Sequence, residues 1–158
     1  MARRVFFSFH YEKDNWRAGQ VRNSWVTKED RESAGFWDAA DWEEVKKKGD
    51  EAIKAWIRKQ MDGTSVTIVL IGAETATRPY VQYEIQQSWV KGNGLIGIYV
   101  HNQKDKNGQK SAKGVDPFVA LGFSGIRTYD WVDDDGYNNL SSWIEAAYSR
   151  ALQRKNAS

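Results

Sequence analysis

The chain has 158 residues, enough for one domain with a single hydrophobic core. The chain has 23 Lys and Arg residues and 21 Asp and Glu residues. This near balance of charge argues against a dedicated nucleic-acid-binding protein. The absence of cysteine excludes disulfides, thiolate metal sites and thiol nucleophiles, and two histidines are too few for a typical zinc site. No apolar run is long enough to span a membrane, and the N-terminus lacks the features of a signal peptide. We therefore expect one cytoplasmic domain over residues 1–158, with no metal, no nucleic acid and no membrane partner.

Strands and helices alternate in the first part of the chain. Residues 5–9 are almost entirely apolar, which predicts a strand buried on both faces. Residues 14–25 have apolar positions at helical spacing and predict a helix. A short strand is predicted at residues 35–38, and one amphipathic helix is predicted from residue 45 to its stop at Gly63.

The middle of the chain contains the strongest strand signal. Residues 65–71 form a β-branched, apolar run that predicts the central strand. A helix follows from about residue 77, because Pro79 suits a first helical turn and residues 92–94 (GNG) end the pattern. Its predicted buried stripe consists of Val81, Ile85 and Trp89.

The last third predicts two more strands and a final helix. Residues 95–100 and 126–131 predict the strands, and residues 140–152 carry a helical apolar stripe. Between the strands, residues 102–124 form a long polar loop, which is either functional or mobile. This order of elements predicts an α/β fold of the flavodoxin-like type, with a central parallel sheet of about five strands and helices on both faces.

Ligands of such sheets bind at the carboxyl ends of the strands, where several common sites are missing. The turn after the first strand, residues 8–12, has no glycine and therefore no dinucleotide-binding fingerprint. A P-loop lysine and a G-x-S-x-G nucleophile elbow are absent from the sequence. The central strand ends in residues 71–73 (IGA), without the aspartate of a phosphoacceptor receiver domain.

Several segments resemble TIR domains. Residues 5–9 (VFFSF) resemble their first strand, residues 35–38 (GFWD) their second, and residues 65–72 their central strand. Residues 80–85 (YVQYEI) resemble the W-x-x-x-E helix of the TIR domains that cleave NAD, with tyrosine in place of tryptophan. The tyrosine keeps an aromatic face at that position.

The resemblance is most specific to the TIR-like proteins of the Thoeris antiphage system, the ThsB type. It is carried by residues 4–11 (RVFFSFHY), 21–28 (VRNSWVTK), 104–118 and 129–143, and so covers nearly the whole chain. It implies a TIR fold and an enzyme that releases nicotinamide from NAD and makes a cyclic ADP-ribose isomer. NAD is then the substrate, and no cofactor is expected.

The same resemblance implies that Glu84 is the catalytic carboxylate. The nicotinamide of NAD is a good leaving group, so one carboxylate that stabilises the charge developing on the ribose suffices. Tyr80 and Glu84 are four residues apart and share one helix face, which we expect to point toward the cleft. Without the resemblance, an ordinary surface glutamate is the commoner outcome.

Further substrate contacts are predicted at the strand ends. We expect Ser8, Phe9 and His10 to line the nicotinamide pocket, although Phe9 is equally suited to the core and His10 to capping the next helix. Asp38 is a candidate ligand of a ribose hydroxyl, with a turn or capping role as the alternative. Arg78 is a candidate contact for the pyrophosphate or a solvated side chain.

The resemblance also implies partners. We expect a separate effector protein to be activated by the product rather than by direct contact, with TIR–TIR homo-oligomers and a phage-derived trigger as further possibilities. Residues 26–34 and 102–124 are candidate covers for the cleft, or plain surface loops. Three alternatives stay open: a TIR interaction module without catalysis, a nucleotide-binding sensor, and a simple NAD hydrolase that yields linear ADP-ribose.

Overall fold

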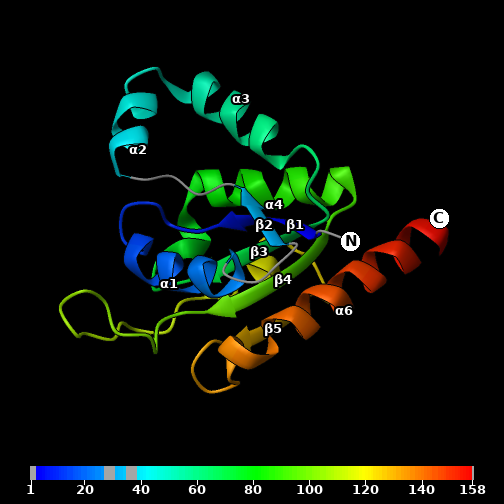
Figure 1. Cartoon of the computed structure of the whole chain (residues 1–158). Coiled ribbons are helices and arrows are strands. Elements are labelled where there is room, and N and C mark those ends of the chain that lie inside the picture. The colour runs from blue at the N-terminus through cyan, green and yellow to red at the C-terminus, as the bar shows by residue number, and fades with distance from the viewer. Residues whose placement is uncertain (1–2, 27–30, 35–38, 158) are drawn as a thin grey trace.

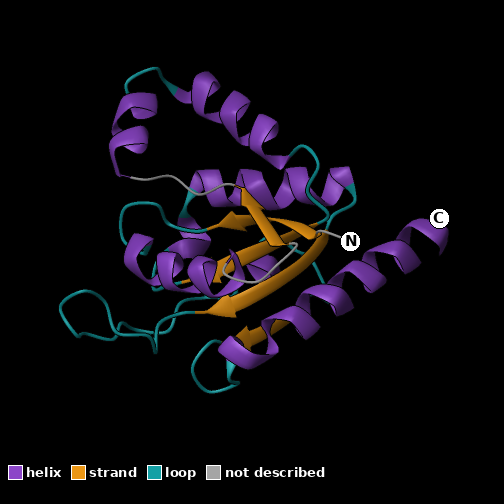
Figure 2. Ribbon diagram, viewed as in Figure 1, coloured by secondary structure: helices purple, strands orange, loops and turns teal. Residues whose placement is uncertain are grey.

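The computed structural model describes residues 3–26, 31–34 and 39–157. Figures 1 and 2 show a central sheet with helices on both sides. The elements, in chain order, are β1 (Arg3–Ser8), α1 (Asn15–Val26), β2 (Arg31–Ala34), α2 (Ala39–Lys46), α3 (Asp50–Met61), β3 (Val66–Ile71), the 3-10 turn η1 (Thr75–Thr77), α4 (Pro79–Lys91), β4 (Gly94–Tyr99), α5 (Pro117–Ala120), β5 (Arg127–Asp130) and α6 (Gly136–Ala157).

The sheet has five parallel strands in the order β2-β1-β3-β4-β5. This is the flavodoxin-like order, so the predicted fold class is confirmed. Helices α1 and α6 contact each other on one face of the sheet, whereas α4 lies on the other face with α3 packed against it (Figure 1). The direction of the crossovers changes between β1 and β3, which opens a crevice at the carboxyl ends of these strands.

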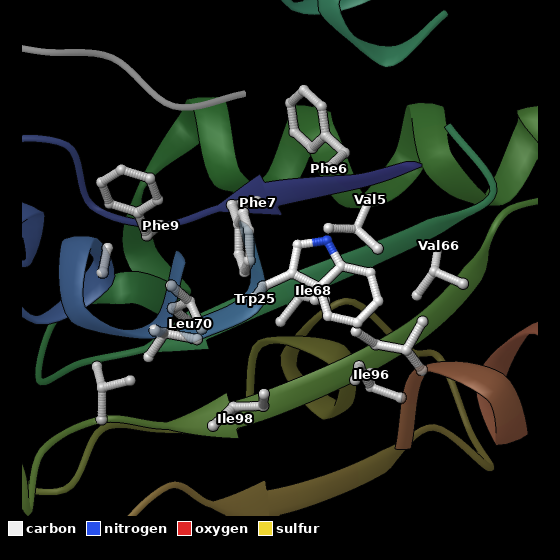
Figure 3. Close-up of a cluster of buried hydrophobic side chains, with 14 of the residues drawn as sticks. Val5, Phe6, Phe7, Phe9, Trp25, Val66, Ile68, Leu70, Ile96 and Ile98 are labelled. Carbon is white, nitrogen blue, oxygen red and sulfur yellow. The ribbon is translucent and has the colours of Figure 1, made fainter. Parts of the chain in front are cut away.

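The core is built from strands that are buried on both faces. All six residues of β3 are buried, as expected for a central strand without a solvent-facing side. Figure 3 shows the larger cluster, in which side chains of β1, β3 and β4 pack with Trp25 of α1. A smaller cluster joins α4 to the segment after β4 and contains Val69, Ile71, Val81, Ile85, Leu95 and Phe118.

The prediction of a single helix from residue 45 was wrong. Two helices, α2 and α3, meet at Gly49, whose φ of 95° lies in the left-handed region that glycine adopts without strain. The apolar residues Ile53, Ile57 and Met61 form the buried side of α3. Their helical spacing continues the spacing seen before Gly49, so the sequence suggested one helix. The stripe predicted for α4 was wrong at Trp89, which is 38% exposed and contacts Phe123 instead of the sheet.

The second strand lies earlier than predicted. Residues 31–34 pair with Arg3–Phe6 of β1 and form the edge strand β2. The predicted strand at residues 35–38 lies outside the described residues. The prediction that residues 26–34 serve as a cover was therefore wrong for residues 31–34, because backbone hydrogen bonds hold them in the sheet.

The long polar loop is anchored at both ends. Its second half contains α5, where Phe118 is fully buried in the smaller core cluster. Its first half is held by the buried Arg17 of α1, which donates from Nε to the Gln103 carbonyl at 2.9 Å and from a terminal nitrogen to the Gln109 carbonyl at 2.8 Å. The segment is therefore tied to the smaller core cluster by Phe118 and to α1 by two carbonyl anchors.

We predict that Arg17→Ala lowers the free energy of unfolding by about 2–4 kcal/mol, because it removes these anchors and leaves the buried Asp14 without its ion-pair partner. Urea unfolding measures the loss, and hydrogen exchange should show faster exchange of the amides of residues 103–111. The control Lys59→Ala changes an exposed residue of α3. Unchanged exchange in the Arg17 variant would show that the loop is held by other contacts.

Candidate active site

Glu84 lies in the interior, on the side of α4 that faces β1. It has no solvent exposure and shares the buried side of the helix with Val81, Ile85 and Ser88. Ser8, the last residue of β1, donates a hydrogen bond to Glu84 Oε1 at 2.6 Å, and the Tyr11 hydroxyl donates one to Oε2. The carboxyl group is therefore held by one hydroxyl at the end of a strand and one just beyond it.

Burial raises the pKa of Glu84 to about 8, and the hydrogen bonds from Ser8 and Tyr11 oppose this rise only in part. The carboxyl group is thus mostly protonated at neutral pH. Strongly shifted carboxyl groups of this kind concentrate at functional sites, because a buried ionisable group costs stability that a purely structural residue would not require.

A small hollow lies beside this carboxyl group, at the carboxyl end of β1. Its cavity volume is about 20 Å³, which is room for about one water molecule. Of the described residues, those on its wall are Phe9, His10, Tyr11, Glu12, Trp42, Arg78, Tyr80 and Val81. Ser8 and Glu84 lie behind this wall, and Tyr11, which is part of the wall, bonds to the carboxyl group through its hydroxyl.

Aromatic rings form most of this wall. The ring of Tyr11 meets that of Phe9 edge-on with centroids 4.9 Å apart, and that of Trp42 at 5.0 Å. Trp42 in turn meets Tyr80 edge-on at 6.3 Å. Trp42 comes from α2, and its Nε1 donates to Glu12 Oε1 at 3.1 Å, which ties α2 to the turn after β1.

The structure brings together most of the residues that the sequence singled out. Phe9 is fully buried and also lines the hollow, so it combines the two roles that were left open. His10 lines the hollow, and its Nδ1 accepts a hydrogen bond from the Lys13 backbone at 3.4 Å. Burial lowers the pKa of His10, and the neighbouring Arg78 guanidinium lowers it further. Arg78 itself lies on the wall.

One expectation needs correction. Tyr80 and Glu84 do not both face the cleft: Tyr80 is half-buried and donates to Asp50 Oδ1 at 2.9 Å, whereas Glu84 is turned inward. Ser8 bonds to Glu84 and is not on the wall of the hollow. Residues 102–124 are not on this wall either, but Asp105, Lys110 and Ser111 line a separate cavity of about 290 Å³ with Asp14 and Glu74, so their role as a cover stays a prediction. Asp38 lies outside the described residues.

Sequence reasoning missed Tyr11 and Trp42. Tyr11 directly follows the strand-end segment that was chosen, so its position alone was a signal. Trp42 carried no such signal, because only the packing of α2 brings it to the end of β1. No group of three or more His, Cys, Asp or Glu residues that could hold a metal ion is found in the described ranges.

Comparison with known proteins adds to this geometry. The family described as "Thoeris protein ThsB, TIR-like domain" matches residues 6–105 of this chain. A protein of Bacillus cereus (strain MSX-D12), named "Putative cyclic ADP-D-ribose synthase ThsB1", is 39% identical over 191 aligned positions, which include 91% of this chain and the full length of that protein.

The buried carboxyl group predicts a pH-dependent stability difference. A raised pKa means that the native state holds a proton that the unfolded chain loses above about pH 4.5, so the native state becomes less stable as the pH rises toward 8. Glu84→Gln cannot titrate, so its free energy of unfolding should exceed that of the unmodified chain by an amount that grows between pH 5 and 8, by at most about 1.4 kcal/mol per pH unit. Urea unfolding at several pH values measures this.

The matched control is Glu51→Gln, which removes an exposed carboxylate of α3. It should show no such growth with pH. If the two glutamine variants behaved alike, burial of Glu84 would not cost the fold any stability.

Proposed function

Since this chain belongs to the Thoeris ThsB family of TIR-like proteins, we propose that it is an enzyme that cleaves the bond between nicotinamide and ribose in NAD and closes the remainder into a cyclic ADP-ribose isomer. Two things support the proposal: the name of the Bacillus cereus relative, and a glutamate held by hydroxyls in the protein interior beside a small aromatic hollow. The observation that carries it is the position of Glu84.

The chemistry suits a single carboxylate. When the bond between the ribose C1′ and the nicotinamide nitrogen breaks, its electron pair stays on the nitrogen, and nicotinamide leaves as a neutral molecule. Positive charge develops on the ribose, and an adjacent carboxylate stabilises that charge in the transition state. An oxygen or nitrogen atom of the ADP half then attacks C1′ and loses a proton, which yields a cyclic product without addition of water.

The neighbouring residues fit roles around this reaction. In our proposal, Glu84 faces the ribose, and Ser8 orients the carboxyl group of Glu84. Phe9 and Tyr80 supply aromatic walls for the nicotinamide. Arg78 is the cation on the wall of the hollow, and it suits the pyrophosphate because a guanidinium can donate two parallel hydrogen bonds to phosphate oxygens. His10 and Asp38 remain candidates for a phosphate and a ribose hydroxyl, respectively.

The protonated state of Glu84 is compatible with this role. NAD carries a positive charge on the nicotinamide ring, and a cation placed near a carboxyl group lowers its pKa. Binding of the substrate thus favours the ionised form that the reaction needs. A buried carboxyl group would serve no purpose in a module that only assembles with other TIR domains, so this feature favours the enzyme over the interaction module.

The proposed partners follow from the reaction. The product would carry the signal to a separate effector protein, so no contact surface for that effector is required on this chain. TIR–TIR association and a phage-derived trigger stay predictions. Within the described part of the chain, none of the helices is both long and apolar enough to cross a bilayer.

We predict that Glu84→Gln reduces nicotinamide release from NAD by roughly 100- to 1,000-fold, because the amide keeps the shape of the side chain but carries no charge. Chromatography with mass analysis measures nicotinamide and the ribosyl product. The unmodified chain should give mainly a product lighter than ADP-ribose by one water molecule, and Glu51→Gln should match the unmodified chain. Linear ADP-ribose as the main product would point to a simple hydrolase, and full activity of the Glu84 variant would remove this residue from the reaction.

The raised pKa also predicts the pH dependence of turnover. At NAD concentrations well below KM, the rate should fall about tenfold per pH unit below a midpoint near 8, since kcat/KM reports the ionisation of the free enzyme. At saturating NAD the midpoint should lie at lower pH, because the bound cation favours the carboxylate. Initial rates of nicotinamide release from pH 5.5 to 9 test this, and a flat profile between pH 6 and 9 would contradict it.

A further inference from the structure

The described conformation leaves no path from the solvent to Glu84. The carboxyl group has no exposed surface, and the hollow in front of it has room for about one water molecule. A nicotinamide ring with its ribose cannot enter this space. If the proposed function is correct, some part of the wall has to move before Glu84 reaches the substrate.

Tyr11 is the side chain that separates the hollow from the carboxyl group. Its hydroxyl bonds to Glu84 Oε2 and its ring lines the hollow. Ser8, the other partner of Glu84, belongs to β1 and is paired in register with Val69 of β3, so it cannot leave without breaking the sheet. Tyr11 lies past the end of β1 in a turn, where such ladder bonds do not restrain it.

Trp42 supports the ring of Tyr11 from the other side and belongs to a short helix. Helix α2 has only eight residues and continues into α3 through Gly49, a position whose φ of 95° suits a bend. It meets the turn after β1 through Glu12, which accepts from Trp42 Nε1 at 3.1 Å and lies 3.4 Å from Lys46 Nζ. An exposed ion pair of this kind is screened by solvent and contributes little to stability.

We propose that Tyr11 is the positioning residue of Glu84 and that its ring, supported by Trp42, is a plug that NAD must displace. The inference rests on the proposed function and adds the identity of the residue that keeps the carboxyl group away from substrate and water. In the plugged state the Tyr11 hydroxyl fixes the carboxyl group. Displacement of the ring opens the space that the nicotinamide needs, so part of the binding energy of NAD is used to open the site.

A reversible cross-link between α2 and the turn tests the plug. The side-chain ends of Glu12 and Lys46 are 3.4 Å apart, and the chain has no cysteine, so Glu12→Cys with Lys46→Cys can be joined specifically by a short bis-methanethiosulfonate reagent. The matched control joins Glu44→Cys in the last turn of α2 to Lys47→Cys just after the helix, where the native ends are 3.6 Å apart. Nicotinamide release should fall at least tenfold in the first pair on cross-linking and recover on reduction to the rate of the same double-cysteine variant before cross-linking, whereas cross-linking should not change the rate of the control pair.

A second readout does not need turnover. Water-soluble carbodiimide with glycine ethyl ester modifies accessible carboxyl groups, and peptide mass spectrometry gives the rate at Glu84. The cross-link should slow this modification, and Tyr11→Ala should accelerate it at least tenfold. If the cross-linked protein were modified and turned over as fast as the reduced protein, the plug would be refuted. If neither form released nicotinamide but modification followed the prediction, the proposed function would fail, and only the role of Tyr11 in enclosing Glu84 would be supported.

The role of the Tyr11 hydroxyl in positioning has its own test. Tyr11→Phe keeps the ring but removes a hydrogen bond that stabilises the ionised carboxyl group, so the midpoint of the kcat/KM profile should move to higher pH. The control Tyr83→Phe removes a hydroxyl that accepts from Arg58 at 2.7 Å, away from Glu84, and should leave the midpoint in place. An unchanged midpoint in the Tyr11 variant would overturn the assignment.

The other titratable and charged groups around the plug lie on the wall of the hollow or bond to it, and none of the described ones bonds to Glu84. They are His10, Glu12 and Arg78 on the wall, Tyr80 from α4, and Lys46 and Asp50 from α2 and α3.

Discussion

The burial of one carboxyl group between β1 and α4 is the feature on which the proposed chemistry of this protein depends. Glu84 is removed from water and is held by two hydroxyls, with no cation among its bonded partners in the described part of the chain. Ionisation in that place is unfavourable, so burial raises the pKa of the group and it is mostly protonated at neutral pH. The sheet supplies the rigidity that keeps such a group buried, because Ser8 is fixed by the ladder between β1 and β3. Stability given up at this position is a common feature of active sites, where function competes with the best packing.

The fold explains why the site lies where it does. In a doubly wound sheet the chain crosses to opposite faces on the two sides of the switch point, here between β1 and β3. The turn after β1 and the start of α4 therefore come together at the carboxyl end of the sheet, and they supply Tyr11 and Tyr80. Helix α2 adds Trp42 from a segment that is not part of the sheet. A carboxyl group fixed by the sheet is thus combined with a wall that other elements supply. In our proposal this wall opens, which suits a reaction that must exclude water and still admit a large substrate.

Much of the fold could be predicted from local patterns. The buried strands β1, β3 and β4 appear as continuous apolar runs, and Pro79 and Gly92 mark the ends of α4. One error arose where the apolar pattern continued but the helix did not. The apolar spacing on both sides of Gly49 suggested one helix, although a positive φ at this glycine separates α2 from α3. In the segment after β4, the polar composition concealed the anchoring by Arg17 and by Phe118, because a single buried contact leaves no periodic signal.

The sequence by itself determined the alternation of strands and helices and the parallel sheet, since these depend on local periodicity, and a motif of fixed spacing singled out the glutamate of α4. Only the tertiary structure decided that Glu84 points inward while Tyr80, four residues earlier, stays at the wall of the hollow. It also decided that Tyr11 and Trp42 close the space in front of the carboxyl group. The physical reason is that helical spacing places two side chains on the same side of a helix, but their burial depends on what β1 and α2 bring against that side. The contacts of Tyr11 with Trp42 and with Glu84 arise from the packing of three separate segments. No sequence pattern within any one of these segments predicts such contacts.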